Sequence, residues 1–264
     1  MKRFDDRFSA QADAYARFRP RYPRALFDHL ASLTPGRRLA WDCGTGSGQA
    51  ARALADRFER VVATDASAEQ LEHAAAHPRI EYRAARAEDV VLEPGSVDLV
   101  TVATAVHWFD FDAFYAAVRR AGRPDGILAV WTYHLPVTDP ALDQVLSRYY
   151  WDVLAGHWPE KFRYVEDHYR SLPFPFRELP APEFAIRAVW TRARLEGFLE
   201  SWSATQAYRK ARGTDPLAEI RDALAAAWGA PDRRRAIRWP LYLRVGTIGA
   251  APAAAAGGGR PATP

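Results

Sequence analysis

Cysteine is almost absent from this chain, in which Cys43 is the single thiol. One cysteine excludes an intramolecular disulfide and any zinc site built from several cysteines. No apolar run approaches the roughly 18 residues of a membrane-spanning helix, and acidic residues stand in Met1–Arg7, where a signal peptide needs an apolar stretch. These absences predict a cytoplasmic protein that has no membrane partner.

Lysine is scarce as well: only Lys2, Lys161 and Lys210 occur, so nearly all 36 basic residues are arginines. The net charge of +4 suggests a nucleic-acid partner only if the positive charges gather on one surface. Instead, 32 acidic residues are spread among the arginines, apart from two basic clusters at 17–24 and 233–238. We therefore do not expect nucleic acid to be the partner, and we expect a small-molecule substrate.

The chain is rich in apolar residues, at 48%, which is enough for a globular core. Between residues 39 and 131, short apolar runs alternate with helical patterns. This alternation predicts βαβ crossovers, and hence a doubly wound α/β fold whose parallel sheet is covered on both faces. The predicted strands are Leu39–Trp41, Val61–Ala63, Ile80–Tyr82, Val97–Ala103 and Ile127–Trp131, and the helices between them are Gln49–Phe58, Glu69–Ala76 and Phe111–Ala121.

The alternation stops near residue 135, and aromatic residues become frequent between 140 and 176. We interpret this region as a helical cap inserted into the fold. Strands are predicted at Phe184–Trp190 and Ile237–Ile248, and a helix at Leu195–Tyr208; Pro240 indicates an edge or a bulge in the last strand. The predicted division is a Rossmann-like core at 1–135, a cap at 136–182, completion of the sheet at 183–249 and a disordered tail at 250–264.

A glycine-rich turn follows the first predicted strand, with the sequence Asp-Cys-Gly-Thr-Gly-Ser-Gly-Gln at 42–49. Glycine permits positive φ and lets a ligand approach the backbone closely. Gln49 stands where a dinucleotide-binding motif needs glycine or alanine, and no Gly-Lys-Ser/Thr follows as in a P-loop. A nicotinamide dehydrogenase and a P-loop enzyme are therefore disfavoured.

At this motif the chain resembles the class I S-adenosylmethionine (SAM) dependent methyltransferases, and among them the group that contains the trans-aconitate methyltransferases. The resemblance implies a seven-stranded, mostly parallel sheet whose last strand is antiparallel. It also implies SAM as the cofactor, S-adenosylhomocysteine as its product and no metal. Asp65, about 20 residues after the motif, would accept hydrogen bonds from both ribose hydroxyls. Arg86 stands where this family often has an acidic residue beside the adenine.

Two flanking segments extend the resemblance. Residues 8–23 are similar to the segment that folds over SAM, and Ala105–Phe109 is similar to the segment at the mouth of the site. The implied cofactor-binding residues are Tyr15, Arg19, Asp42, Gly44, Thr45, Gly46, Gly48, Gln49, Asp65, Ala66, Ala87, Glu88 and Ala105. The implied substrate-binding residues are Tyr22, Trp108, Tyr133 and Trp151.

His107 is the candidate catalytic residue, because histidine titrates near neutral pH and can act as a general base. A wall residue beside Trp108 is the alternative, and Cys43 is interpreted as a buried spectator. The predicted function is methyl transfer from SAM to a small molecule, with a carboxylate as one acceptor class. An RNA or protein methyltransferase and a non-catalytic SAM-binding protein are the alternatives.

Overall fold

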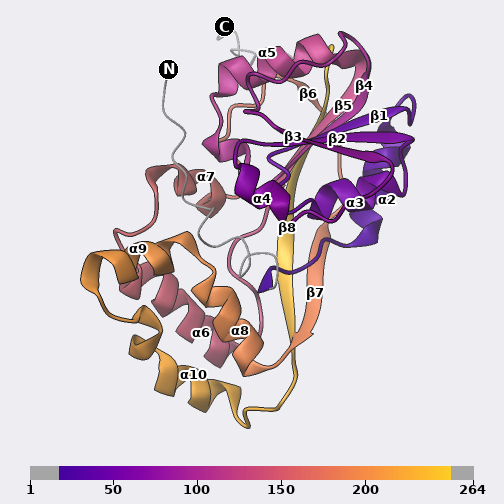
Figure 1. The fold of residues 1–264 in the computed structure, drawn as a ribbon. Coiled ribbons are helices and arrows are strands. Elements are labelled where there is room, and N and C mark those ends of the chain that lie inside the picture. Colours follow the sequence, from indigo (N-terminus) through magenta and orange to yellow (C-terminus); the bar gives the residue numbers. More distant parts are fainter. Residues whose placement is uncertain (1–17, 251–264) are drawn as a thin grey trace, which may run out of the picture.

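The computed structural model describes residues 18–250. Tyr15, with most of the segment 8–23 that resembles the one folding over SAM, and the tail from residue 251 lie outside the described residues. Within them, helices and strands form an α/β layer at one end of the molecule and a helical lobe at the other, joined by the long strand β8 (Figure 1). None of the described helices is both long and apolar enough to span a membrane.

The sheet is doubly wound, as predicted. Its strands lie in the order β3-β2-β1-β4-β5-β8-β6. Because β2 and β4 flank β1, the chain reverses its winding direction there, and the carboxyl ends of β1 and β4 open onto the crevice where such folds bind ligands. The five parallel strands are β1 (Leu39–Cys43), β2 (Arg60–Asp65), β3 (Ile80–Ala84), β4 (Val97–Ala103) and β5 (Gly122–Thr132).

Alternate residues of the central strands enter two separate hydrophobic cores. Ala40 and Val61 face one core together with the helices α2 and α3, whereas Trp41 and Val62 face the other together with α5. Both faces of the sheet are therefore covered, which explains why its strands read as continuous apolar runs. The helices beside the sheet are α2 (Arg24–Leu33), α3 (Gln49–Ala55), α4 (Ala68–Glu72) and α5 (Phe111–Ala121).

The helical lobe comes from two stretches of chain on either side of β7. One prediction fails there: the single helix expected at 195–208 is two helices, since α8 ends at Glu200 and α9 begins at Ser203. Trp202 is extended between them, and its ring packs against Trp158. The elements of the lobe are α6 (Pro140–Arg148), the π-helical turn η3 (Tyr149–Val153), α8 (Arg192–Glu200), α9 (Ser203–Arg212), η5 (Pro216–Glu219) and α10 (Arg221–Trp228).

Strand β8 (Arg235–Thr247) is antiparallel to its neighbours and changes partner along its length. Its first half pairs with β7 (Phe184–Trp190), and its second half pairs with β5 and with the two-residue strand β6 (Arg177–Glu178). Pro240 lies opposite Ala185 of β7, two residues before pairing with β5 begins at Tyr242. The missing N–H of Pro240 therefore falls where the strand changes partner. Strand β6 was not predicted, because two residues show no periodicity.

Candidate functional site

The glycine turn between β1 and α3 is built on left-handed backbone. Gly44, Gly46 and Gly48 have φ values of 66°, 55° and 79°, a conformation that is costly for residues with a Cβ. A Cβ on Gly44 would lie 2.6 Å from the Cβ of Ala105. The turn and the segment that follows β4 are therefore in direct contact, as the sequence motifs predicted for one shared site.

Asp42 stabilises this turn through side-chain hydrogen bonds. Thr45 Oγ1 donates to one carboxylate oxygen over 2.5 Å, and Thr101 Oγ1 donates to the other over 2.7 Å. Burial raises the pKa of Asp42 to about 6, against the lowering effect of these hydrogen bonds. The structure thus gives Asp42 a role in shaping the turn, and its contact with the cofactor stays a prediction.

Asp65 closes β2 beside the same turn. Its two carboxylate oxygens accept the backbone N–H groups of Gly46 over 2.8 Å and of Ser67 over 3.0 Å. A carboxylate has about four acceptor sites, and the backbone N–H groups, that of Ala66 included, take only part of them. The remainder suits a ribose hydroxyl. Burial raises the pKa of Asp65. Ala66 follows this carboxylate directly, and its contact with the cofactor stays a prediction.

The segment after β3 completes this side of the site. Ala87 is buried, and Glu88 accepts the backbone N–H of Asp110 over 2.8 Å. The Nε of Arg86 lies 3.3 Å from the other oxygen of Glu88. Arg86 is therefore engaged by the neighbouring acid, and the group that meets the adenine stays a prediction.

Gln49 connects the turn to the segment that precedes α2. Its Oε1 accepts the N–H of Tyr22 over 3.1 Å, and its Nε2 donates to the carbonyl of Pro20 over 3.2 Å. The hydroxyls of Tyr22 and Thr104 lie 3.2 Å apart. These contacts tie residues 20–22 to the start of α3 and to the end of β4, and the expectation that this segment covers SAM stays a prediction.

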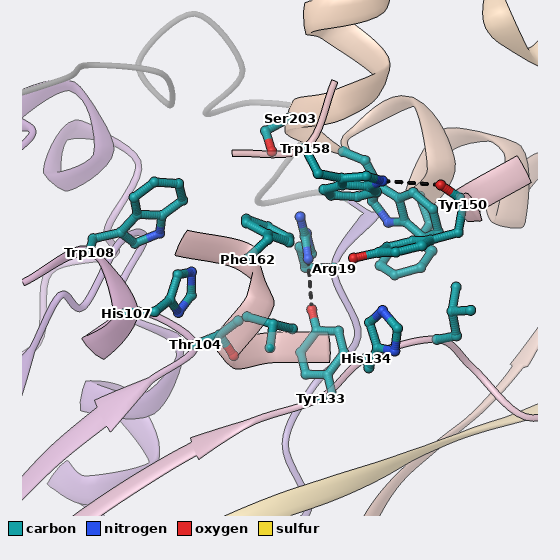
Figure 2. Close-up of a pocket in the computed structure, with 14 residues that line it drawn as sticks. Arg19, Thr104, His107, Trp108, Tyr133, His134, Tyr150, Trp158, Phe162 and Ser203 are labelled. Carbon is teal, nitrogen blue, oxygen red and sulfur yellow. Dashed lines mark hydrogen bonds between the residues drawn. The ribbon is translucent and has the colours of Figure 1, made fainter. Parts of the chain in front are cut away.

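A pocket opens beyond the end of β4, between the sheet and the helical lobe (Figure 2). It contains about 600 Å³ of empty space, part of which is open solvent. Two of its lining residues are joined by a hydrogen bond, since Nη1 of Arg19 donates to the hydroxyl of Tyr133 over 3.0 Å. The described lining residues are Arg19, Thr104, His107, Trp108, Tyr133, His134, Leu135, Tyr150, Trp158, Phe162, Val165, Phe198, Trp202 and Ser203.

The predicted substrate residues are only partly brought together here. Trp108 and Tyr133 line the pocket. Tyr22 lies beside the lining, with its ring centre 6.4 Å from that of Tyr133. Trp151 does not line the pocket, and 49% of its surface is exposed.

Three residues that line this pocket each have a buried polar atom that makes no hydrogen bond among the described residues: Nε2 of His107, Nε2 of His134 and Oγ of Ser203. Burial lowers the pKa of His107 to about 3 and that of His134 to about 4, so both rings are neutral at physiological pH. A buried polar group without a partner costs about 1–3 kcal/mol. Their convergence on one aromatic pocket indicates a ligand site.

Sequence reasoning missed His134 and Ser203. His134 follows Tyr133 at the end of β5, so its place at the ligand-binding edge of the sheet could have been inferred. Ser203 was hidden by the expectation of a continuous helix at 195–208. The aromatic residues Trp158 and Phe162 belong to the cap in which we predicted substrate contacts, but no spacing singled them out.

The chain is similar to known methyltransferases over most of its length. A family described as "Methyltransferase domain" matches residues 41–130. A Dictyostelium discoideum protein, provisionally named a methyltransferase, is 33% identical over 248 residues, which cover 91% of this chain and 94% of the relative. A Saccharomyces cerevisiae protein, provisionally named a SAM-dependent methyltransferase, is 26% identical over a match that covers 78% of this chain and 84% of the relative.

A solved structure from Anaeromyxobacter dehalogenans, provisionally described as a type II methyltransferase, is 49% identical to this chain. The two superpose with a TM-score of 0.82 over 88% of this chain and 98% of the other. The likeness therefore includes the helical lobe as well as the sheet.

Proposed function

Because the chain belongs to the class I SAM-dependent methyltransferases, we propose that it methylates a small molecule bound in the aromatic pocket. The observation that carries this proposal is the set of buried polar atoms without partners among the described residues that line the pocket. SAM supplies a methyl group that its sulfonium already activates. The protein therefore has to bind the acceptor, align it and exclude water.

The residues of the glycine turn fit the cofactor. A Cβ at Gly44 or Gly48 would collide with Ala105 or Tyr82, so only glycine lets the turn keep this shape beside Asp65. Asp65 offers free lone pairs to a ribose from a fixed position. We propose that these residues hold SAM along the carboxyl ends of β1 and β2.

The segment 104–108 joins the two halves of the proposed site. Ala105 touches the glycine turn, whereas Thr104, His107 and Trp108 line the pocket. An acceptor in the pocket would thus lie beside the methyl group, and alignment at about 3–3.5 Å can supply much of the rate enhancement.

The charge of the pocket favours a carboxylate as the acceptor. Arg19 is permanently charged, and no aspartate or glutamate lines the pocket in the described part of the chain. The two histidines are neutral, so they do not offset this positive charge. A carboxylate is ionised at neutral pH and needs no base, whereas a protonated amine would be repelled by Arg19.

Calorimetry with SAM tests the cofactor site. We expect binding by the wild type and a loss of about tenfold or more in Asp65→Ala, because hydrogen bonds to a charged group are worth about 1.5–3 kcal/mol. Asp56→Ala, which removes an exposed carboxylate after α3, should bind like the wild type. Absence of SAM binding by the folded wild type would contradict the proposal.

An acceptor screen with radiolabelled SAM tests the substrate class. We expect methylation of aromatic carboxylic acids, with weaker or no reaction of matched amines and phenols, and a rise in the acceptor KM in Arg19→Met. If only amines or phenols react, the proposal of a carboxylate acceptor is wrong, whereas the proposal of methyl transfer to a small molecule is still supported. Methylation of RNA or protein would favour the alternative substrate classes.

A further inference from the structure

His107 is held by a tyrosine from the cap side of the pocket. Its Nδ1 lies 2.8 Å from the hydroxyl of Tyr169, and both side chains are buried. The opposite ring atom, Nε2, is buried at the pocket without a partner among the described residues. Which of the two ring nitrogens carries the proton therefore decides what His107 offers to a ligand.

We infer that Tyr169 fixes the tautomer of His107 with the proton on Nε2, so that His107 donates a hydrogen bond to the acceptor instead of removing a proton from it. Tyr169 is then a positioning residue that helps to select anionic acceptors. The tautomer rests on this hydrogen bond and on the acidity of its two groups. The identity of the group that accepts the hydrogen bond from Nε2 depends on the proposed methyl transfer to a carboxylate.

The direction of the hydrogen bond follows from the acidity of the two groups. A phenol, with a pKa near 10, is a good donor, whereas the basic nitrogen of a neutral imidazole is a good acceptor. The favoured arrangement is therefore O–H of Tyr169 to Nδ1 of His107. A neutral imidazole carries one proton, so that proton stays on Nε2.

The backbone around Tyr169 is built to hold this hydroxyl in place. His168 and Tyr169 both have positive φ, 62° and 61°, which persists only where the surroundings impose it. The N–H of Tyr169 donates to the carbonyl of Tyr164 over 2.7 Å, and Nη1 of Arg244 donates to the carbonyl of Tyr169 over 3.1 Å. The His168 ring stacks on Tyr242 with a centroid distance of 3.6 Å.

The surroundings of His107 keep its ring neutral. Aromatic rings of Trp108, Phe162 and Tyr169 pack around it. Lys161 is the charged group on this side, and its Nζ donates to the carbonyl of Trp108 over 2.8 Å. Burial, and to a smaller extent Lys161, lower the pKa of His107. The imidazolium form is thus disfavoured, and a neutral donor remains.

A donor at His107 complements the other polar groups of the pocket. Figure 2 shows His107 and His134 on opposite sides of the view, with Arg19 and Tyr133 between them. Arg19 has only donors, and an ionised carboxylate has only acceptor sites. An acceptor that has to lose a proton on methylation would find no base at His107.

Histidine tautomers measured by two-bond ¹H–¹⁵N NMR test the inference without any acceptor. The sample is the full chain with bound S-adenosylhomocysteine, and His107→Gln identifies the His107 signals among the seven histidines. We expect a protonated Nε2 and a bare Nδ1 from pH 5 to pH 8. A proton on Nδ1 would overturn the inference, whatever the result of the acceptor screen.

Tyr169→Phe removes the hydroxyl and should give a mixture of both tautomers at His107. Tyr115→Phe is the matched control, because the buried Tyr115 hydroxyl donates to the Pro173 carbonyl over 2.5 Å and ties the same segment to the core without touching His107. An equal change in both variants would mean that loosening of the segment, and not the hydrogen bond, sets the tautomer.

The donor role is tested with phenylacetate as a probe and phenylacetamide as its uncharged control. Phenylacetate should move the His107 Nε2–H signal more than the amide does; no movement would overturn the contact. If acids are substrates, Tyr169→Phe should raise the acceptor KM about twofold, the reciprocal of the fraction of molecules that keep the proton on Nε2, and leave the KM for SAM unchanged.

His107→Gln separates a donor from a base, since glutamine keeps an N–H donor but has no basic nitrogen. We expect it to retain more activity than His107→Ala. Equal loss in both variants, together with a wild-type rate that depends on an ionisation near neutral pH, would assign proton removal to His107 and overturn the inference.

Discussion

Asp42 shows at the residue scale how a binding turn can be maintained at a cost to stability. The carboxylate is fully buried, and its two hydroxyl partners offset only part of the burial penalty. Its pKa in the folded protein, about 6, exceeds the usual value of 3.8. The folded state therefore binds the Asp42 proton more tightly than the unfolded state does.

The sign of the pH effect follows from this raised pKa. The stabilising contribution is complete below about pH 4 and is lost as the pH rises through about 6. Without cofactor, the free energy of unfolding of the wild type relative to Asp42→Asn should fall by up to about 3 kcal/mol between pH 4 and pH 7. Urea unfolding of both proteins at each pH measures the difference, and parallel pH profiles would contradict it.

At the scale of elements, the turn before α3 depends on its fit against β3. A Cβ on Gly48 would meet the Tyr82 hydroxyl at a distance that requires movement, whereas a Cβ on Gly46 would come no closer than 3.7 Å to Gln70. Both glycines have positive φ, so both alanine variants should lose about 1–2 kcal/mol through the backbone. Gly48→Ala should lose more than Gly46→Ala in thermal unfolding.

The double variant Gly48→Ala with Tyr82→Phe isolates the collision, because it removes the nearest oxygen. It should recover part of the extra loss in melting temperature but none of the backbone cost. If Gly48→Ala and Gly46→Ala have the same melting temperature, the packing against Tyr82 is not what requires glycine at residue 48.

The segment before α2 is held to the turn by Gln49. In Gln49→Ala, the Tyr22 amide loses its acceptor and should exchange with deuterium faster, by about threefold or more for one lost hydrogen bond. Gln49→Glu keeps an acceptor and should protect Tyr22 better. Gln206→Ala, which removes a side-chain hydrogen bond to Glu200 in the lobe, should leave residues 18–24 unchanged.

The sequence predicted elements best where periodicity is local. Strand Val97–Ala103 and helix Phe111–Ala121 have the predicted bounds, and Ser67 caps α4 through a hydrogen bond from the N–H of Gln70. The pocket was harder to predict. His134 and Ser203 meet there only because β8 and the lobe bring distant segments together, and no local pattern records that packing.

At the scale of the whole molecule, β8 joins the sheet to the lobe. The first half of this strand pairs with β7, and its second half pairs with β5. Arg244, on β8, donates to the carbonyls of Tyr169 and Leu172 and pairs with Glu178. Arg235, at the start of the same strand, donates to the carbonyls of Ala227 and Trp228 in α10. Because one strand is bonded to both parts, sheet and lobe should unfold as one cooperative unit.

Thermal unfolding followed in two ways tests this cooperativity. Far-ultraviolet circular dichroism and tryptophan fluorescence should give coincident transitions. Arg244→Met should lower the melting temperature but keep one transition. Two separate transitions, the first of which removes part of the helical signal together with tryptophan fluorescence, would show that the lobe, which contains Trp158, Trp202 and Trp228, melts independently.

Cys43 lies fully buried between Asp42 and Gly44, and burial raises the pKa of its thiol. A thiol reagent in solution can therefore react with the native protein only when the core around the end of β1 opens. Since the chain has one cysteine, the rate of its modification by Ellman's reagent reads that opening without any introduced label. The single cysteine is thus a native reporter of local opening at the end of β1, directly before the glycine turn.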